Sequence, residues 1–255
     1  MPAKDNSDKA DFWDDSWKTS LEAPIHGPDD ASYWPNEIDE RKLRFIRRSL
    51  PQAGTVAEVG CGSARFLARI GRTSPKLHLV AIDESPNALK LAQRTAEAFD
   101  VTIEARESKV EHLPFETASV DLILSGGLME HFQDPVPILK EMLRVLRVGG
   151  VFYADVVPRK LSWYRSAEAS RMKSSEWLAP DVYEAAFGES DYRRWLTELG
   201  CEHLAICYAG VYPPHMSTLR PAIRKPLGRL LEFLDGTPLA ERWGWYFMVK
   251  GQKVR

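Results

Sequence analysis

The chain has 255 residues, of which 44% are hydrophobic and 27% are charged, and its formal net charge at pH 7 is -2. This length and apolar content are enough for one α/β domain with additions, and the near-neutral charge gives no overall drive toward nucleic acid. The three cysteines are odd in number and lack a CxxC spacing, so we expect no metal site and a reducing, cytoplasmic setting.

Nothing in the sequence predicts export or a membrane span. Residues 1–15 carry charges and lack the apolar core of a signal peptide. No apolar run approaches the ~20 residues that cross a bilayer.

A strand, a glycine turn and a helix are predicted in succession between residues 55 and 70. Residues 55–59 are rich in β-branched side chains, and apolar residues recur at helical spacing over residues 66–70. Gly60 and Gly62 leave room for a ligand at the free N–H groups of the helix start. A dinucleotide fingerprint would have a third glycine at position 65, where this chain has Arg65, so NAD and FAD fit poorly.

Strand-like and helix-like segments then alternate, which predicts an α/β fold with a doubly wound, mostly parallel sheet of seven strands. Ser85 and Pro86 are expected to cap and begin the next helix, and Gly149 and Gly150 to stop a helix over residues 138–146. The other expected strands are residues 77–82, 101–105, 120–124, 151–157, 201–209 and 243–250, the last two as an antiparallel pair, and further helices are expected over residues 37–50 and 191–199.

Polar residues stand at the carboxyl ends of the predicted strands, where ligands bind in such sheets. Glu58 precedes Gly60 at the end of the first strand, and an acid there repels pyrophosphate but can bind a cationic amine. Asp83 ends the second strand, and residues 108–111 and 125–127 follow the next two. Together these strand ends predict a nucleotide-bearing cofactor other than a dinucleotide.

Five segments in order resemble the class I S-adenosylmethionine-dependent methyltransferases, in the small-molecule branch that includes the ubiquinone and menaquinone enzymes. They are residues 56–65, 79–83, 113–123, 129–131 and 143–150. The resemblance implies a Rossmann-like methyltransferase fold and S-adenosyl-L-methionine as cofactor, with Glu58 near its methionine moiety and Asp83 on its ribose hydroxyls. The cofactor-binding residues expected on this basis are Glu58, Gly60, Cys61, Gly62, Asp83, Glu84, Lys109, Val110, Ser125 and Gly126.

Two positions depart from the family pattern. Ala64 replaces the third family glycine, and we expect it to shift a contact rather than abolish the site. Family members commonly have an aspartate at the position of Lys109 that accepts the adenine amino group, and a lysine cannot accept a hydrogen bond. The adenine contact then comes from backbone or from Glu107 or Glu111, or else Lys109 marks a changed ligand.

The methyl acceptor is expected beside the end of the fourth strand. Gly126 and Gly127 leave space there for a substrate, and His131 lies close behind them. With an unperturbed pKa of about 6.5, His131 is either a general base or a residue that shapes the loop. A base is needed only if the acceptor holds its proton, because the sulfonium is already a good leaving group.

Substrate choice is expected in the segments around this core. We predict one domain over residues 1–255, with an N-terminal lid and helix (1–50), a cofactor-binding core (51–157) and substrate-side insertions (158–190 and 210–242). In related enzymes an N-terminal segment folds over the cofactor, and here it carries Trp13 and Trp17. The expected substrate residues are Tyr33, Trp34, Gly127, Trp163 and Tyr212.

The insertion over residues 210–242 contains a basic, apolar run. Its leucines Leu227, Leu230, Leu231 and Leu234 share a predicted helical face, with Arg224, Lys225 and Arg229 nearby. We expect this face to dock on the sheet, and contact with a membrane surface is the alternative.

The sequence therefore predicts an enzyme that transfers the methyl group of S-adenosylmethionine to an O, N or C atom of a small, aromatic or apolar metabolite. A cofactor-binding accessory subunit without turnover is one alternative, and Lys109 motivates it. Methylation of a macromolecule is another, and the lack of an Asn/Asp-Pro-Pro-Tyr sequence at Ser125 and of a basic appended domain counts against it. The acceptor molecule and the oligomeric state stay open.

Overall fold

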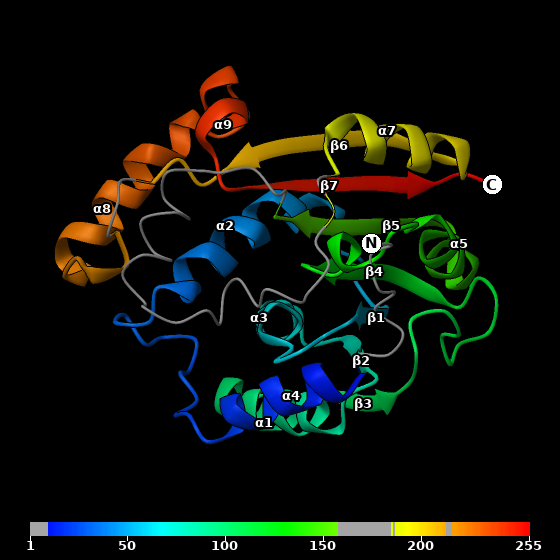
Figure 1. Ribbon diagram of the computed structural model, residues 1–255, viewed down its shortest axis with the longest axis horizontal. Helices are drawn as coiled ribbons and strands as arrows, with labels where there is room; N and C mark the ends of the chain where they lie inside the picture. Colours follow the sequence, from blue (N-terminus) through cyan, green and yellow to red (C-terminus); the bar gives the residue numbers. More distant parts are fainter. Residues whose placement is uncertain (1–9, 158–184, 186, 213–215) are drawn as a thin grey trace, which may run out of the picture.

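A seven-stranded sheet organises the computed structural model, which describes residues 10–157, 185, 187–212 and 216–255 (Figure 1). The strand order is β3-β2-β1-β4-β5-β7-β6, and only β7 runs antiparallel to its neighbours. The predicted α/β fold with a mostly parallel sheet is confirmed. The strands are β1 Gly54–Val59, β2 Leu77–Asp83, β3 Glu104–Glu107, β4 Val120–Gly126, β5 Leu146–Val156, β6 Cys201–Ala209 and β7 Tyr246–Lys253.

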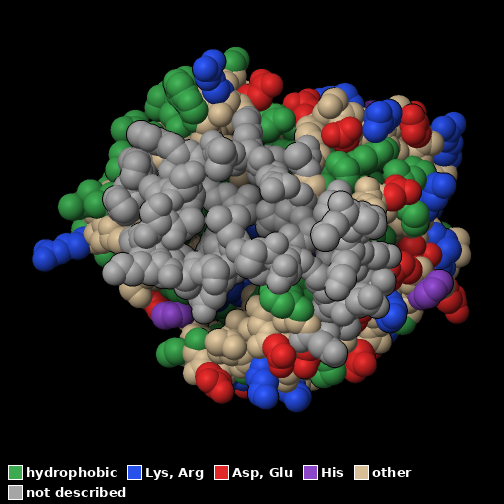
Figure 2. Space-filling model, in the orientation of Figure 1, with side chains coloured by type: hydrophobic (Ala, Val, Ile, Leu, Met, Phe, Trp, Pro, Cys, Tyr) green, Lys and Arg blue, Asp and Glu red, His purple; other side chains and the backbone are tan. Residues whose placement is uncertain are grey.

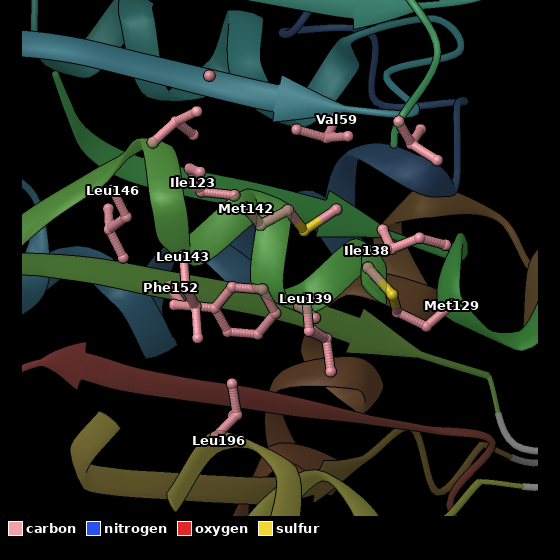
Figure 3. Close-up of a cluster of buried hydrophobic side chains, with 14 of the residues drawn as sticks. Val59, Ile123, Met129, Ile138, Leu139, Met142, Leu143, Leu146, Phe152 and Leu196 are labelled. Carbon is pink, nitrogen blue, oxygen red and sulfur yellow. The ribbon is translucent and has the colours of Figure 1, made fainter. Parts of the chain in front are cut away.

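Helices cover both faces of this sheet. One buried apolar cluster joins the sheet to α2, α3 and α4, and a second joins it to α5 and α7. Figure 3 shows the second cluster, in which Ile123 of β4, Phe152 of β5, Leu139 of α5 and Leu196 of α7 point toward one another. The helices are α1 Ala10–Leu21, α2 Pro35–Ile46, α3 Arg65–Thr73, α4 Pro86–Phe99, α5 Val136–Val145, α7 Glu189–Glu198, α8 Pro221–Leu231 and α9 Pro238–Trp243, with 3₁₀ turns η2 Arg47–Ser49, η3 Met129–His131, η5 Met216–Thr218 and η6 Glu232–Leu234.

The start of α4 forms as the sequence predicts. The Ser85 hydroxyl accepts a hydrogen bond from the Ala88 N–H at 3.0 Å, and Pro86 is the first helical residue. This cap fixes the chain immediately after Asp83, at the end of β2. The N-terminus of α4 thereby fixes the loop that follows β2, which belongs to the candidate site.

Two predicted boundaries differ from the structure. Strand β3 begins at Glu104 rather than at 101, because α4 runs to Phe99 and Asp100 then turns in a left-handed conformation. Helix α5 ends at Val145, and Gly149 lies inside β5 where the pairing with β4 shifts register. The two glycines therefore shape an irregularity in the strand and do not stop a helix.

Smaller shifts affect the remaining ends. Helix α2 begins at Pro35, and the last part of the predicted 37–50 helix is the 3₁₀ turn η2. Strand β7 starts at Tyr246, because α9 occupies the chain up to Trp243. Helix α7 covers 189–198 instead of 191–199.

The segment over residues 210–245 leaves the sheet at the same edge as the candidate site. Strands β5 and β6 are both antiparallel to β7, so they run in the same direction. The carboxyl end of β6 therefore lies at the edge where the parallel strands end, and the connection to β7 through α8 and α9 begins there. No helix in the described part of the chain combines the length and the apolar character needed to cross a bilayer.

Candidate functional site

The glycine turn after β1 has the tight geometry expected for a close ligand approach. Gly60 and Gly62 have φ values of 65° and 47°, which favour glycine. A Cβ on Gly60 would lie 2.8 Å from Leu128 Cδ1, so Leu128 would have to move before a side chain could fit there. Ala64, at the family's third glycine, also has a left-handed backbone with φ 50°, which costs an alanine roughly 1–2 kcal/mol.

Asp83 joins this turn to the start of α4. Its Oδ2 accepts the Gly62 N–H at 2.9 Å, and its Oδ1 accepts the Ser85 N–H at 3.0 Å. Burial raises the pKa of the Asp83 carboxyl, and the backbone hydrogen bonds from Gly62, Ser85 and Glu84 oppose that shift. Each carboxylate oxygen has more than one lone-pair direction, so Asp83 can hold the loop and still accept from a diol.

Glu58 is a buried carboxyl at the end of β1, and its Oε2 has no hydrogen-bond partner among the described residues. Burial raises the pKa of Glu58 to about 8, Lys42 opposes the rise, and Asp155 adds to it. An unsatisfied, buried acceptor beside the glycine turn is the kind of group that a bound amine would satisfy.

Lys42 and Asp155 complete this charged cluster, and sequence reasoning missed both. Lys42 Nζ on α2 lies 2.8 Å from Asp155 Oδ1 near the end of β5. Asp39, one turn earlier on α2, is also buried, and burial raises the pKa of its carboxyl. Asp39, Glu58 and Asp155 thus interact electrostatically with Lys42, which makes the region receptive to a cation.

The Asp155 carboxylate fills the space that Gly126 leaves open. A Cβ on Gly126 would lie 3.0 Å from Asp155 Oδ2, and the Gly127 N–H donates to the Asp155 carbonyl at 3.0 Å. Ser125 is buried beside them, and its Oγ has no hydrogen-bond partner in the described part of the chain. The ends of β4 and β5 therefore present an unsatisfied hydroxyl, from Ser125, and an anchored carboxylate, from Asp155.

The residues expected to contact the adenine of the cofactor lack a side-chain hydrogen-bond acceptor at position 109. Lys109 is exposed and Val110 is buried, and the Ser108 N–H donates to the Asp83 carbonyl at 3.1 Å. Burial raises the pKa of Glu84, Glu111 adds to the rise, and Lys109 opposes it. Lys109 thus acts on neighbouring carboxylates, so it offers charge compensation in place of a hydrogen-bond acceptor.

Cys61 is a packing residue within the turn. Its side chain is buried, and burial raises the pKa of the thiol well above its ordinary value, with Asp83 and Glu58 adding to the rise. The thiol therefore stays protonated at neutral pH and is not a nucleophile. The described residues contain no group of three His, Cys, Asp or Glu side chains placed to hold a metal ion.

Helix α1 lies across this turn. Asp14 accepts hydrogen bonds from the Ser85 hydroxyl at 2.6 Å and from the Asn87 N–H at 3.1 Å, which fixes α1 on α4. Trp17 packs on Gly62, where an added Cβ would lie 2.6 Å from its ring. The Trp13 ring contacts His131 of η3, with centroids 4.8 Å apart.

Three of the expected substrate residues lie together, but on the other side of α2. Trp34 packs edge-on against Tyr212, with centroids 4.9 Å apart, and Tyr33 stacks on His26 at 4.1 Å. All three line a cavity of about 310 Å³ between residues 28–34, α2 and α8, and none of the expected cofactor residues lines it. Gly127 follows β4, His131 contacts Trp13 of α1, and Trp163 lies outside the described residues.

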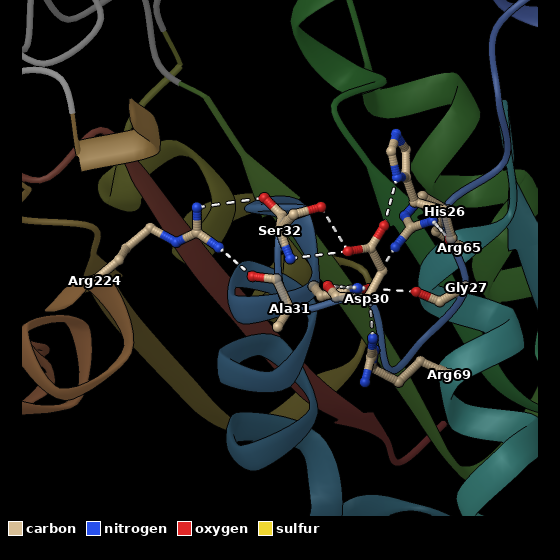
Figure 4. A network of polar contacts seen from close by, with 9 residues as sticks. His26, Gly27, Asp30, Ala31, Ser32, Arg65, Arg69 and Arg224 are labelled. Atoms are coloured by element: carbon tan, nitrogen blue, oxygen red, sulfur yellow. Dashed lines mark hydrogen bonds and ion pairs between the residues drawn. The ribbon is translucent and has the colours of Figure 1, made fainter. Parts of the chain in front are cut away.

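The loop before α2 is tied down by arginines, as Figure 4 shows. Arg65 donates to the His26 carbonyl at 2.8 Å and to Asn36 Oδ1 at 2.6 Å. Arg224, from α8, donates to the Ala31 carbonyl at 2.7 Å and also lies 2.8 Å from Glu37. These contacts join the N-terminal segment to α3 and α8.

The comparisons with known proteins agree on a family for the core. Residues 57–154 match the family model described as a methyltransferase domain. An uncharacterized chloroplastic methyltransferase of Arabidopsis thaliana is 30% identical over 66% of this chain and 51% of its own length. The ubiquinone biosynthesis O-methyltransferase of Xylella fastidiosa is 27% identical over 56% of each chain. This chain thus spans little more than half the length of these relatives.

Solved structures share the fold across almost the whole chain. A geranyl diphosphate C-methyltransferase from Streptomyces coelicolor A3(2), bound to Mg²⁺, geranyl diphosphate and S-adenosyl-L-homocysteine, has a TM-score of 0.60 at 14% identity, covering 98% of this chain and 100% of that one. A possible histamine N-methyltransferase from Thermotoga maritima has a TM-score of 0.58 at 19% identity, covering 85% and 89%. At these identities the likeness establishes the fold alone.

Proposed function

This chain belongs to the class I S-adenosylmethionine-dependent methyltransferases, and we propose that it transfers the cofactor's methyl group to an O, N or C atom of a small, aromatic or apolar metabolite. The observation that carries the proposal is the buried Glu58 carboxyl, whose Oε2 has no partner among the described residues beside the Gly60 turn. A carboxyl in this place suits the cationic amine of a methionine moiety, and Asp83 across the turn suits a ribose diol.

The residues present fit this cofactor along its length. Asp83 is the acceptor for the two ribose hydroxyls, and Glu58 is the acceptor for the amine. The backbone of Lys109 and Val110 is the remaining contact for adenine, because the lysine side chain has no acceptor. Bound S-adenosylmethionine supplies an electrophilic methyl group on a good leaving group.

The chain's own contribution is to position the acceptor and to exclude water. Gly127 leaves room beside the expected methyl group, whereas Asp155 fills the space at Gly126, and Trp13 and Trp17 of α1 cover the turn. Alignment of the two reactants and removal of water account for most of such a rate enhancement.

An acceptor that holds a proton needs a base, and two side chains qualify by position. His131 follows the glycine loop on η3, and Asp155 lies directly behind Gly126 with Lys42 as its partner. A hydroxyl or amine acceptor would pass its proton to one of them as the new bond to carbon forms. The variants His131→Ala and Asp155→Asn separate the two, because only loss of the true base lowers kcat without changing cofactor affinity.

Calorimetry with S-adenosylmethionine and S-adenosylhomocysteine is the direct test of cofactor binding. We expect wild type to bind both, and Asp83→Ala to bind about a hundredfold more weakly, since two charge-assisted hydrogen bonds contribute about 3 kcal/mol or more. Glu97→Gln, an exposed acid on α4, is the matched control and should bind like wild type. A wild-type chain that binds neither compound would remove the proposal.

Turnover distinguishes the enzyme from an accessory subunit. The isolated chain, incubated with S-adenosylmethionine and a metabolite extract, should release S-adenosylhomocysteine together with a product that is one methylene heavier. Thermal unfolding of Asp83→Ala without ligand is measured alongside, because Asp83 also accepts from Gly62 and Ser85. Tight cofactor binding without any product would favour the accessory role.

A further inference from the structure

The outer surface of α8, η6 and α9 is unusually apolar. Among the described residues eight large hydrophobic side chains are exposed, and five of them lie on these three elements. We call these five the apolar patch: Ile223 (56% exposed), Leu230 (63%), Phe233 (69%), Leu239 (39%) and Trp243 (46%). Figure 2 shows hydrophobic side chains gathered at the upper left of the molecule, over the position of α8 and α9 in Figure 1.

This patch is not the face by which α8 docks. The helix packs through Arg224 and Gly228, which are buried, and through Leu227, which contacts the Tyr212 and Met216 cluster. Positions 223, 226, 230 and 233 follow the i, i+3, i+7, i+10 spacing of the opposite face. The expectation that Leu230 docks on the sheet is therefore wrong, and Leu231 and Leu234 are only half-buried.

Two of the acidic side chains on these elements face the protein, whereas most of the basic side chains are exposed to solvent. Glu232 and Asp235 turn inward, where they form ion pairs with Arg44 at 2.5 Å and with Arg41 at 3.2 Å. Arg224 also points inward, so it cannot serve the surface role considered for it from the sequence. Four basic residues between 220 and 243 are exposed, namely Arg220, Lys225, Arg229 and Arg242, whereas Glu241 is the single exposed acid in that range.

We propose that the apolar patch and its basic rim form a docking surface for a bilayer that contains anionic phospholipids. Leu230, Phe233 and Trp243 enter the headgroup region, and Lys225 and Arg229 meet the phosphates. Interfacial helices are rich in Lys and Arg on their polar face and carry Trp, Phe and Leu on the other. The Arg242 guanidinium carbon lies 5.9 Å from the centroid of the Trp243 ring.

Charge selects a lipid surface over a second copy of this chain. In a two-fold contact the same patch faces itself, so the basic rims of both copies would be brought together. Lys225 and Arg229 stand at the rim of the cavity between α2 and α8 and are exposed, and an anionic bilayer compensates the bases that face it. The docking surface also lies at the strand edge that carries Glu58 and Asp155, so a membrane bound there would lie beside the cofactor site.

Vesicle cosedimentation tests this surface. We use phosphatidylcholine vesicles with and without about one third phosphatidylglycerol, and expect binding to the anionic vesicles that weakens with added salt. Lys225→Gln with Arg229→Gln should lower the partition coefficient about 25-fold, since each charge contributes about 1 kcal/mol. Leu230→Ser with Phe233→Ser should lower it at least as much, on the order of 25-fold.

Two control variants remove the same kinds of side chain at other positions on the surface. Val148→Ser removes an exposed apolar side chain of β5, and Lys76→Gln with Lys140→Gln removes two exposed charges elsewhere, and both should bind like wild type. Equal binding by the patch variants and wild type would overturn the proposal. So would self-association without vesicle binding that Leu230→Ser with Phe233→Ser abolishes, because the partner would then be a second copy.

Discussion

Helix α2 separates two polar regions that differ in how their cationic side chains are paired. Toward α8, Arg41 contacts the Tyr212 hydroxyl, the Gly228 carbonyl and Asp235. Toward the sheet, the next residue, Lys42, pairs with Asp155, while Glu58 Oε2 and Ser125 Oγ have no described hydrogen-bond partner. Asp235 Oδ1 also lacks a hydrogen-bond partner among the described residues, but Asp235 is already paired with Arg41. The α8 side therefore holds elements together, whereas the unpaired Glu58 and Ser125 atoms are ready for a ligand.

The difference teaches how to tell structural charge from functional charge in this molecule. Arg224 is nearly inaccessible to solvent and reaches Glu37 and the carbonyls of Ala31, Ser32 and Ser217. A substitution on that side should lower stability and leave ligand affinity unchanged. On the sheet side, a substitution that neutralises an acid should do the reverse.

Arg224→Ala is the change with the largest expected effect. It leaves Glu37 and three carbonyls without their donor, so we expect the free energy of unfolding to fall by about 3–5 kcal/mol in urea denaturation. Lys225→Ala, the exposed neighbour, should change it by less than about 0.5 kcal/mol. A stable Arg224→Ala variant with weakened S-adenosylhomocysteine binding would break the comparison.

Glu58→Gln should stabilise the ligand-free protein, in contrast to Arg224→Ala, and should weaken ligand binding. The amide removes a carboxyl that burial disfavours, so the ligand-free protein should gain stability at alkaline pH. Loss of the charge-assisted contact should weaken S-adenosylhomocysteine binding by about 1.5–3 kcal/mol. Binding of 5′-methylthioadenosine, which lacks the amino acid moiety, should be unchanged in calorimetry. Equal weakening for both ligands would place Glu58 elsewhere along the cofactor.

The raised pKa of Glu58 also predicts a pH dependence. The carboxyl stays protonated in the folded protein up to about pH 8 but ionises in the unfolded chain near its ordinary value of 4.5. The unfolded state therefore loses its proton first, so the free energy of unfolding should fall as the pH rises through that window. Chemical denaturation across the window should show this slope, and Glu58→Gln should reduce it.

Ligand binding should also reveal the protonation state of Glu58. An amine beside Glu58 favours the ionised carboxyl, so S-adenosylhomocysteine binding at pH 7 should release a proton. Calorimetry in two buffers of different ionisation enthalpy measures that release. Glu58→Gln should abolish it, and a wild type that releases no proton would contradict the assigned contact.

Ala64→Gly should have the smallest effect. Glycine relieves the left-handed strain at this position but adds freedom to the unfolded chain, so we expect a net gain of about 0.5 kcal/mol in unfolding free energy. Ala68→Gly, within helix α3 at an ordinary backbone conformation, should instead lose about 1 kcal/mol or more. A loss at both positions would show that strain at Ala64 is negligible.

Sequence patterns located the sheet side of this comparison because its signals are local. The glycine turn, Asp83 and the Ser85 cap lie within segments whose spacing follows one strand and one helix. The rule that ligands bind at strand ends then places them together. Asp155 follows the same rule at the end of β5, so a strict search of strand ends would have found it.

Sequence patterns did not locate the region between α2 and α8, because that region depends on contacts between residues far apart in the chain. Arg41 meets Tyr212 and Arg224 meets Glu37 only after α8 folds against α2, and no local spacing encodes that approach. Arg65 illustrates the same limit, since its guanidinium turns away from the glycine turn to Asn36. Trp34 was predicted as a substrate residue, but the cavity that it lines forms only where α2 and α8 meet, so the sequence did not locate that cavity.

The connection between β6 and β7 is attached to the sheet at a single place. Ala209 and Tyr246 are register partners, so the 36 residues between them, 210–245, depart from and return to adjacent points of the sheet. Replacement of this segment by another would leave the sheet pairing intact, provided that the new segment supplies a partner for Arg41. The apolar patch and the α8 side of the cavity could therefore change by exchange of these 36 residues, without altering the strands that carry Glu58 and Asp83.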